Sequence, residues 1–581
     1  MTSLFPFTKS LLIPVMVTLP LTDLLAQNDT LQMDVTFVGN RQMEVRDAVK
    51  LSSWPKSRPL SVSKPILSYE LLSRRMQFVP QMTPVEATRL RVDPSLSRLY
   101  RGYVRAGGGT RGTSMVDASY TDLRSRDGSW GTAFHHAATN SPSALLTGRL
   151  NENTLDAWVS RFVGKEKMSF EASAGSEQVL MYGFDSLQVD SALTPADAPV
   201  VMWSHATLGA SFKSHKNRDR ELNHEIDATL GWLRNDRGAH ERSVSLNATL
   251  DKAFGEARGQ LDVEVQLDEY GAGANVTSNQ AIVVVEPSVS TQKGAIHAKA
   301  GLGLAIDADQ PTRDGLGDAF HLYPRAEVSV NLLRNLFVPY GKIGGDLSAN
   351  NFHSLTRQNP FYAPSDLGLA SPNQGFRSTN KRLALAGGIR GTVTEAFRFH
   401  GYFSTASHED YALFRPAAST VDSVTLATFD VVYDTLAIRT LGGEAEFDLG
   451  SDWSFAGGVK FLKYNTRSEL RAWNLPRTTW NARATYALIE GLDLTATVTY
   501  IGKRFSILRE TGYGDTQPLE DGTFELALPG YLDLNLTANY TYNDRLGGWL
   551  TLANVANAKY AEWGGFPVQG FQALAGVHYA F

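Results

Sequence analysis

Hydrophobic and polar residues alternate over the last eleven residues of the chain. Counted back from the final residue, every second position is apolar, whereas Gln572, His578 and Ala580 occupy positions between them. Successive side chains of a β-strand point to opposite faces, so this period of two predicts a strand with one apolar face. The exposed end of that face carries Val577, Tyr579 and Phe581.

The same alternation recurs along residues 98–581. Between Tyr531 and Asn543, Leu and Tyr residues alternate with Asp, Asn and Thr, and the segment Leu492–Tyr500 repeats the pattern. Apolar residues on one face and polar residues on the other are typical of strands whose outer face contacts lipid and whose inner face lines a lumen. We therefore expect an all-β fold, a transmembrane antiparallel up-and-down β-barrel, whose last strand (Val577, Tyr579, Phe581) also serves as an assembly signal.

The connections between these segments alternate between tight turns and long loops. Tight turns are expected at Gly164–Lys167 and Ile489–Leu492, for example, and long loops near 348–379, 408–427 and 504–528. One strand per interval gives about 22 strands, an even number that leaves both termini on the periplasmic side.

The N-terminal part of the chain has a different character. Lys9 precedes an apolar stretch that ends at Ala26, which predicts a secretory signal peptide over residues 1–26. Residues 27–97 are rich in proline and show little alternation. We expect them to form a short irregular periplasmic or lumenal segment, either a reduced plug or a coupling arm, ahead of the barrel at 98–581. A secreted barrel places the protein in the outer membrane of a Gram-negative cell.

Composition narrows the possible functions. The 581 residues carry a formal net charge of -5 and a mean hydropathy of -0.21, as expected where alternate strand residues are polar. The chain has no cysteine, which excludes disulfides, thiolate metal sites and a lipoprotein anchor. Secretion and the negative charge argue against nucleic acid as a partner, so outer-membrane lipid is the first partner expected.

Two aromatic loops are the strongest candidates for a functional site. The loop 351–380 carries Phe361 and Tyr362 between prolines, and a second loop carries Trp563 and Phe566. Loops of this length are usually functional or disordered. They are expected to serve either as a lid or as a surface for a partner. The alternative is simple loop packing over the pore mouth, without a function of its own.

No residue pattern selects a catalytic, cofactor or metal site. His135 and His136 are adjacent on a strand and point to opposite faces, so they cannot share an ion. His408-Glu409-Asp410 is interpreted as a solvated rim rather than a catalytic cluster. We expect no enzyme and no cofactor, although a barrel hydrolase assembled from separate strands stays open as a third alternative.

The C-terminal strands resemble those of TonB-dependent receptor barrels. The segment Asn554–Tyr560 matches the family's Asn-Leu-Phe-(Asn/Asp)-x-x-Tyr pattern and is followed by the terminal Phe581. Near the N-terminus, Met33–Arg41, with Val35, Val38 and Gly39, is similar to the family's energy-coupling box. Only about 60 residues separate this box from the barrel, roughly half the length of the family's plug domain. The glycine-rich strands of that plug domain are not found in this segment.

The resemblance implies transport across the outer membrane, with periplasmic energy-coupling or surface proteins as partners. The alternative from another class is a structural barrel subunit of an envelope assembly or secretion complex. The sequence selects no substrate, because lumenal Asp, Asn and Thr suit sugars, peptides and chelates alike.

Overall fold

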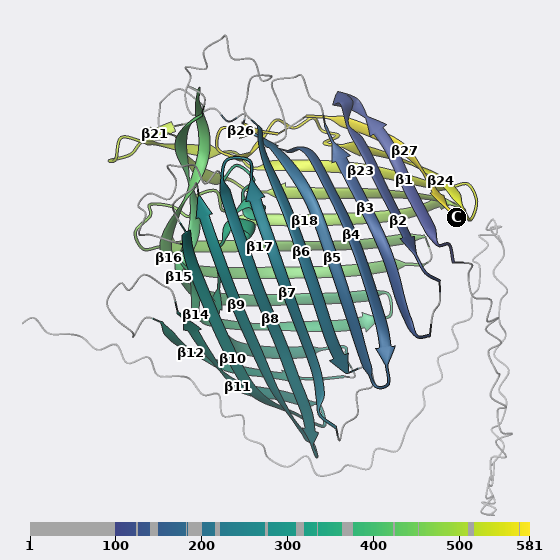
Figure 1. Cartoon of the computed structure of the whole chain (residues 1–581), viewed down its shortest axis with the longest axis vertical. Helices are drawn as coiled ribbons and strands as arrows, with labels where there is room; N and C mark the ends of the chain where they lie inside the picture. The colour runs from purple at the N-terminus through teal and green to yellow at the C-terminus, as the bar shows by residue number, and fades with distance from the viewer. Residues whose placement is uncertain are drawn as a thin grey trace, which may run out of the picture. The chain divides into compact units, whose positions relative to one another are not determined.

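The computed structural model shows a closed antiparallel β-barrel of 22 strands (Figure 1). It describes residues 99–581 except 124–125, 140–148, 182, 184–199, 215–220, 273–276, 309–318, 334, 363–375, 422–423, 451, 509–515 and 569. Each strand pairs with the next along the chain, and the last strand pairs with the first. The predicted all-β transmembrane barrel and its strand number are therefore confirmed.

The 22 barrel strands carry the labels β1–β19, β23, β24 and β27. They are β1 (Gly102–Gly109), β2 (Ser114–Thr121), β3 (Gly128–Ala138), β4 (Arg149–Val163), β5 (Glu166–Leu180), β6 (Val200–Ser214), β7 (Asn223–Asn235), β8 (Ala239–Phe254), β9 (Ala257–Ala272), β10 (Thr277–Lys293), β11 (Ile296–Asp307), β12 (Phe320–Val330), β13 (Val338–Ser348), β14 (Thr379–Thr394), β15 (Phe397–Val421), β16 (Val424–Leu449), β17 (Trp453–Thr466), β18 (Thr478–Ile489), β19 (Leu492–Ile501), β23 (Tyr531–Thr541), β24 (Leu546–Ala553) and β27 (Gln572–Ala580).

Smaller elements lie in the connections at one end of the barrel. They are η1 (Thr110–Gly112), α1 (Phe352–Gln358), the sheet of β20 (Arg504–Leu508), β21 (Thr516–Pro518) and β22 (Phe524–Leu528), and the pair β25 (Ala561–Trp563) and β26 (Phe566–Pro567). We call this end the long-loop end and the opposite one the tight-turn end. Within the described part of the chain, no helix has the length and hydropathy needed to cross a membrane.

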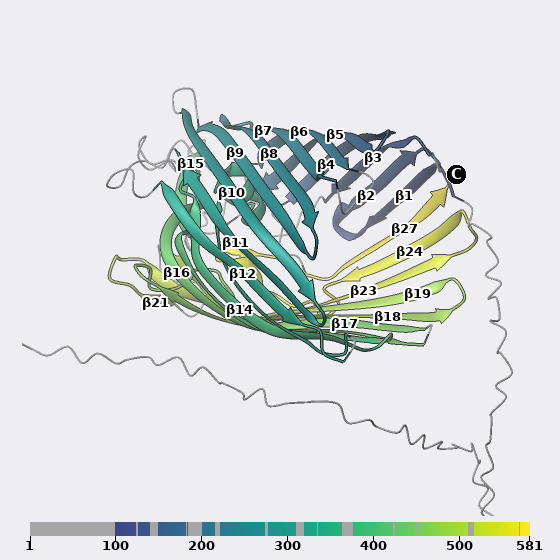
Figure 2. The same cartoon turned by 90° about the horizontal axis from the view of Figure 1, so that it is seen from below.

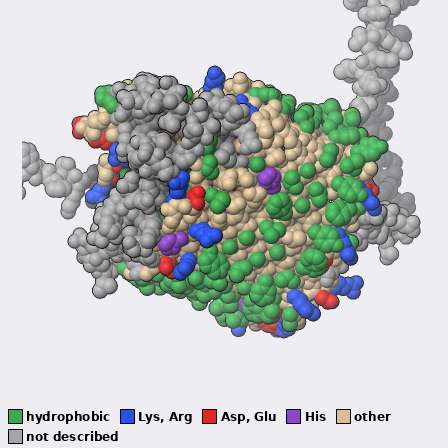
Figure 3. Space-filling view, turned by 45° about the horizontal axis from the view of Figure 1, so that its top comes forward, with side chains coloured by type: hydrophobic (Ala, Val, Ile, Leu, Met, Phe, Trp, Pro, Cys, Tyr) green, Lys and Arg blue, Asp and Glu red, His purple; other side chains and the backbone are tan. Residues whose placement is uncertain are grey.

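The outer surface of the barrel is apolar and its inner surface polar, in the predicted register. On β23, Leu532, Leu536 and Tyr540 are exposed on the outside, while Asn535 faces inward and donates a 2.8 Å hydrogen bond to the inward Asp533. On β27, Val577, Tyr579 and Phe581 are 60%, 43% and 51% exposed. Figure 3 shows hydrophobic side chains spread over the outer wall, as a lipid-facing surface requires.

The ring closes where the terminal residue meets the first strand (Figure 2). Phe581 and Gly102 exchange two backbone hydrogen bonds, each 2.9 Å long. The Phe581 ring covers Gly102 so closely that a Cβ atom on Gly102 would lie 2.2 Å from Phe581 Cζ. An aromatic ring packed over a strand glycine stabilises the pairing at the closing seam.

We expect Gly102→Val to lower the amount of folded barrel, because the new side chain must displace the Phe581 ring at a cost of about 1–3 kcal/mol. Heat-modifiable gel mobility after expression in the outer membrane measures this loss. Gly401→Val is the matched control, since a Cβ atom on Gly401 would have no neighbour within 4 Å. Equal folded fractions for the two variants would contradict this role of the seam.

One predicted long loop is in fact a strand hairpin. The region 408–427 was expected to be a loop. In the structure β15 continues to Val421, β16 begins at Val424, and the two strands pair up to this turn. Beyond Glu409, β15 has no pairing with β14, and a bulge at Asp410, with φ of 50°, bends it. Pro416 does not interrupt β15, since proline is tolerated in a strand whose N–H side has no partner.

Three further connections at the long-loop end are short. β1 and β2 are joined through η1, β7 and β8 are joined across Asp236–Gly238, and β9 ends at Ala272 only a few residues before β10 begins at Thr277. The strict alternation of tight turns and long loops is therefore wrong at four places around the ring. The predicted signal peptide and the segment 27–97, including the candidate coupling residues Val35, Val38 and Gly39, lie outside the described residues.

Candidate functional site

A buried aromatic cluster joins two loops to opposite parts of the barrel wall at the long-loop end. Its loop side chains, which we call the cap, are Phe352, Leu355, Phe361, Tyr362, Phe376, Trp563 and Phe566. The wall contributes lumen-facing residues from β5–β9, among them Trp203, Leu233 and Tyr270. The β15–β16 hairpin contributes further buried residues, among them Phe414 and Phe429. All four aromatic residues predicted as lid candidates belong to this one cluster.

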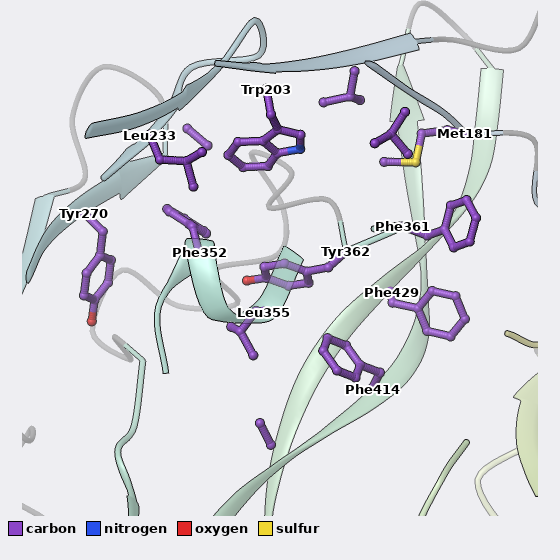
Figure 4. Close-up of a cluster of buried hydrophobic side chains, with 14 of the residues drawn as sticks. Met181, Trp203, Leu233, Tyr270, Phe352, Leu355, Phe361, Tyr362, Phe414 and Phe429 are labelled. Carbon is purple, nitrogen blue, oxygen red and sulfur yellow. The ribbon is translucent and has the colours of Figure 1, made fainter. Parts of the chain in front are cut away.

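Helix α1 carries the first part of the cap. Asn351 caps it, because its side chain accepts a 2.8 Å hydrogen bond from the Ser354 N–H while the Ser354 hydroxyl accepts one from the Asn351 N–H. These two hydrogen bonds at the N-terminus fix the direction of α1. The helix thereby presents Phe352 and Leu355, both fully buried, to the cluster. Figure 4 shows Phe352 beneath Trp203 and close to Tyr362.

The aromatic rings form a continuous series between the two sides. Phe352 lies 6.3 Å from Trp203 and 6.1 Å from Tyr270 between ring centroids, and Tyr362 lies 6.2 Å from Phe414. The parallel bridge between Tyr362 and Phe429 and a 3.2 Å hydrogen bond from the Phe429 N–H to the Phe361 carbonyl attach this loop to β16. Each such ring buries 150–250 Å², so the cluster is a substantial hydrophobic core.

The second loop enters through the hairpin β25–β26. Phe566 stacks on Phe361 with centroids 3.8 Å apart, and Trp563 packs edge-on against Phe414 and Phe429, each at 5.3 Å. Phe566 also lies against Gly183, where a Cβ atom would come within 2.1 Å of its ring. The structure thus brings together two loops that are about 200 residues apart in the sequence.

Hydrogen bonds fix the return of the first loop to the wall. The Phe376 N–H donates to the Tyr270 hydroxyl at 2.7 Å, and the Arg377 N–H donates to the Tyr433 hydroxyl at 3.2 Å. The Arg377 guanidinium forms a 3.1 Å ion pair with Asp410 at the bulge of β15. Backbone groups of the loop are therefore paired inside the mouth, as buried polar groups must be.

Burial shifts the pKa of two ionisable side chains in the first cap loop. Burial, together with the nearby Arg357 guanidinium and His205, lowers the pKa of His353. Burial also raises the pKa of the Tyr362 hydroxyl well above its usual range. Burial at the cap therefore disfavours the charged forms of both side chains.

Below the cap, the wall formed by β8–β10 is acidic on its lumenal face. Arg258 pairs with Asp251 at 2.7 Å, and Arg325 of β12, two strands from β10, pairs with Glu286. The register of the strands places six carboxylates on this face, those of Glu241, Asp251, Asp262, Glu264, Asp268 and Glu286. The lumen next to the cap therefore favours positively charged or hydrogen-bonding solutes.

The histidine-containing clusters considered from the sequence form polar contacts with neighbouring side chains. His135 Nδ1 contacts Asp117 Oδ1 at 2.6 Å, whereas His136 Nδ1 contacts Asn153 Oδ1 at 2.7 Å. Glu409 pairs with Arg382, and Asp410 with Arg377. Over the described ranges, no three His, Asp or Glu side chains are arranged to hold a metal ion.

The receptor-like segment Asn554–Tyr560 is a tight turn after β24. Asn554 and Asn557 adopt positive φ angles of 46° and 49°, which Asn tolerates better than most residues. The Asn554 side chain closes the turn by donating to the Ala558 carbonyl and accepting from the Ala558 N–H. Tyr560 then stacks on Tyr531 of β23 at 3.6 Å, so the motif has a structural role in joining the last strands.

Sequence analysis did not identify the wall residues that receive the cap. Trp203 and Tyr270 occupy lumenal positions of strands whose other lumenal residues are mostly polar. An aromatic residue in the polar phase of a strand is therefore the signal that would have found them. The same phase analysis would have placed Glu241 and Asp268 next to the cap.

Solved structures of outer-membrane transporters share this fold. The FrpB iron transporter from Neisseria meningitidis (F3-3 variant) superposes with a TM-score of 0.63 at 12% identity, over 84% of this chain and 82% of that chain. The pyoverdine outer membrane receptor FpvA from Pseudomonas aeruginosa PAO1, bound to pyoverdine, gives a TM-score of 0.61 at 10% identity, over 84% and 79%. The copper transporter OprC gives 0.57 at 13% identity, over 83% and 81%.

No protein-family model matches the chain, and no curated protein sequence matches it. Because the sequence identity to these solved structures is only 10–13%, the similarity establishes the barrel fold and nothing finer. The resemblance of the C-terminal strands to TonB-dependent receptor barrels is confirmed at that level.

Proposed function

We propose that this protein transports solutes across the outer membrane through a barrel whose outer mouth is gated by the cap. The observation that carries the proposal is the placement of the cap, because two loops from distant parts of the chain converge on one cluster inside the mouth of a 22-strand barrel. Barrels of about this size enclose a lumen that must be filled or gated. The mouth residues thus control passage rather than perform chemistry.

Metal chelates are the first cargo to test. The solved structures that share the fold are named for iron, pyoverdine and copper, and they are transporters and receptors rather than enzymes. The acidic and amide-rich lumenal face of β8–β10 supplies the hydrogen-bonding groups that chelates need. We place the protein in the outer membrane of a Gram-negative cell, with a periplasmic energy-coupling protein as partner. Residues 27–97, as a reduced plug or coupling arm, would receive that partner.

Uptake by intact cells tests this proposal. Cells that express the full-length protein should accumulate radiolabelled iron or copper chelates faster than cells without it, and a proton ionophore should abolish the difference. Leu322→Ala, on the lipid face of β12, is the control variant and should transport like the wild type. If none of the chelates accumulates, whether or not the ionophore is present, chelate transport is wrong and the structural-subunit alternative is favoured.

A further inference from the structure

Two carboxylates are buried next to each other where the cap meets the wall. Glu241 on β8 faces Tyr270 on β9, and Asp268 precedes Tyr270 by two residues on the same lumenal face. Both residues are 3% exposed. Within the described part of the chain, neither forms an ion pair with Lys, Arg or His, and the charge of Asp268 acts on Glu241. The structure therefore holds two nearby carboxyl groups away from water.

Such a pair is unfavourable by itself. Moving a carboxylate out of water is costly unless a positive charge or several hydrogen-bond donors replace the solvent, and a second carboxylate nearby adds repulsion. Glu241 Oε2 accepts a 3.1 Å hydrogen bond from the His353 N–H, and Asp268 Oδ1 accepts one of 2.7 Å from Gln266 Nε2. The Phe352 N–H also donates to Glu241, and the Asn351 side chain to Asp268. All four donors are neutral, so none supplies the positive charge that an ionised pair requires.

A third oxygen donor lies directly opposite Asp268. Gln280 on β10 pairs with Asp268 in the register and is also 3% exposed. Gln280 Nε2 donates a 2.7 Å hydrogen bond to Ser378 Oγ, which fixes the orientation of the amide. Gln280 Oε1 and Asp268 Oδ2 accept no hydrogen bond from any described residue. Side chains opposite each other on adjacent strands are close neighbours, so these two buried oxygens lie in one small region.

We propose that Glu241, Asp268 and Gln280 bind a calcium ion. Carboxylate and amide oxygens are the ligands that Ca²⁺ prefers, and its flexible coordination of six to eight oxygens leaves places for water. The three side chains offer neither nitrogen nor sulfur ligands, which disfavours Zn²⁺. Mg²⁺ requires a stricter octahedron and gives up its water reluctantly, so it should bind more weakly. The site goes beyond the proposed transport function, because it does not depend on the cargo.

The position of the site gives the ion a structural role. Glu241 contacts the first turn of α1 through the His353 N–H, and Asn351, which caps α1, lies within hydrogen-bonding reach of Asp268. A calcium ion between β8, β9 and β10 would therefore hold the wall and the base of the cap together. Removing calcium should loosen the cap without unfolding the barrel.

Isothermal titration calorimetry of the purified full-length protein tests the site, with CaCl2 added after treatment with a chelator. Asp268→Asn is nearly isosteric and removes one charge and one ligand oxygen. We expect it to weaken calcium binding by at least roughly tenfold, the loss seen even for contacts that only support a metal ligand. Asp262→Asn is the control, since Asp262 faces the same lumen but is hydrogen-bonded by Thr249 and Gln260.

Three results would overturn the proposal. The first is no heat of binding when CaCl2 is added to the wild type at neutral pH, which would mean that a proton neutralises the pair instead. The second is unchanged binding in Asp268→Asn. The third is equal losses in Asp268→Asn and Asp262→Asn. If Asp268→Asn fails to fold, Gln280→Leu replaces it in the same comparison, because that variant removes the amide oxygen and leaves both charges in place.

Discussion

Leu536→Arg should leave most of the protein unable to form a stable barrel. Leu536 lies in the middle of β23, is 36% exposed and belongs to the outer row with Leu532 and Tyr540. An arginine near the bilayer midplane costs about 2–4 kcal/mol in such barrels. Urea titration of protein folded into lipid vesicles, followed by heat-modifiable mobility, measures this cost.

Thr497→Arg on the neighbouring strand β19 is the matched control. Thr497 pairs with the lumenal Asn535 and therefore faces the inside of the barrel. Its arginine would enter a wet, acidic lumen and should change the free energy of unfolding little. Asn535 itself is unsuitable, because it accepts a 2.9 Å hydrogen bond from the Asn554 N–H. Equal destabilisation by the two arginines would show that the assignment of inner and outer faces is wrong.

The double variant Phe361→Ala/Phe566→Ala should open the mouth of the barrel. The two rings stack at 3.8 Å and connect the two cap loops, and both are at least 95% buried. Truncating a buried phenylalanine costs about 3–5 kcal/mol, which exceeds the stability of many local structures. We expect several-fold larger single-channel currents in planar bilayers than for the wild type, with an unchanged yield of folded barrel.

Phe403→Ala is the control for this experiment, since Phe403 lies on the lipid-facing side of β15 and is 51% exposed. It should leave the currents at the wild-type level. Unchanged currents in the double variant would mean that other parts of the chain close the lumen, and that the cap is not its gate. A gain of current in Phe403→Ala as well would point to a general loosening of the barrel.

The candidate site was predicted only in its loop residues. Phe361, Tyr362, Trp563 and Phe566 are conspicuous in the sequence because they are aromatic residues in long polar loops. That the two loops contact each other could only be expected, because the sequence of neither loop specifies the distance between them. Trp203 and Tyr270 were missed because the environment of a strand side chain can be inferred only after the strand's lumenal and lipid-facing sides have been assigned.

The β15–β16 hairpin shows a second limit of sequence reasoning. Its outer half contains Pro416 and small polar residues, which in isolation indicate a loop. Pairing between the two strands overrides that tendency, because the hairpin supplies backbone hydrogen bonds over its whole length while β14 and β17 supply none there. Local propensity in strands is weak beside such pairing.

The sequence by itself determined the class of fold, the number of strands, their inner and outer faces and the closing role of Phe581. These features follow from a period of two that each strand expresses independently, because every strand meets lipid on one side and the lumen on the other. Only the tertiary structure decided which wall residues receive the cap, where the hairpin bends and which carboxylates are buried together. Those features arise from contacts between different strands and loops, and their positions depend on the closure of the whole ring.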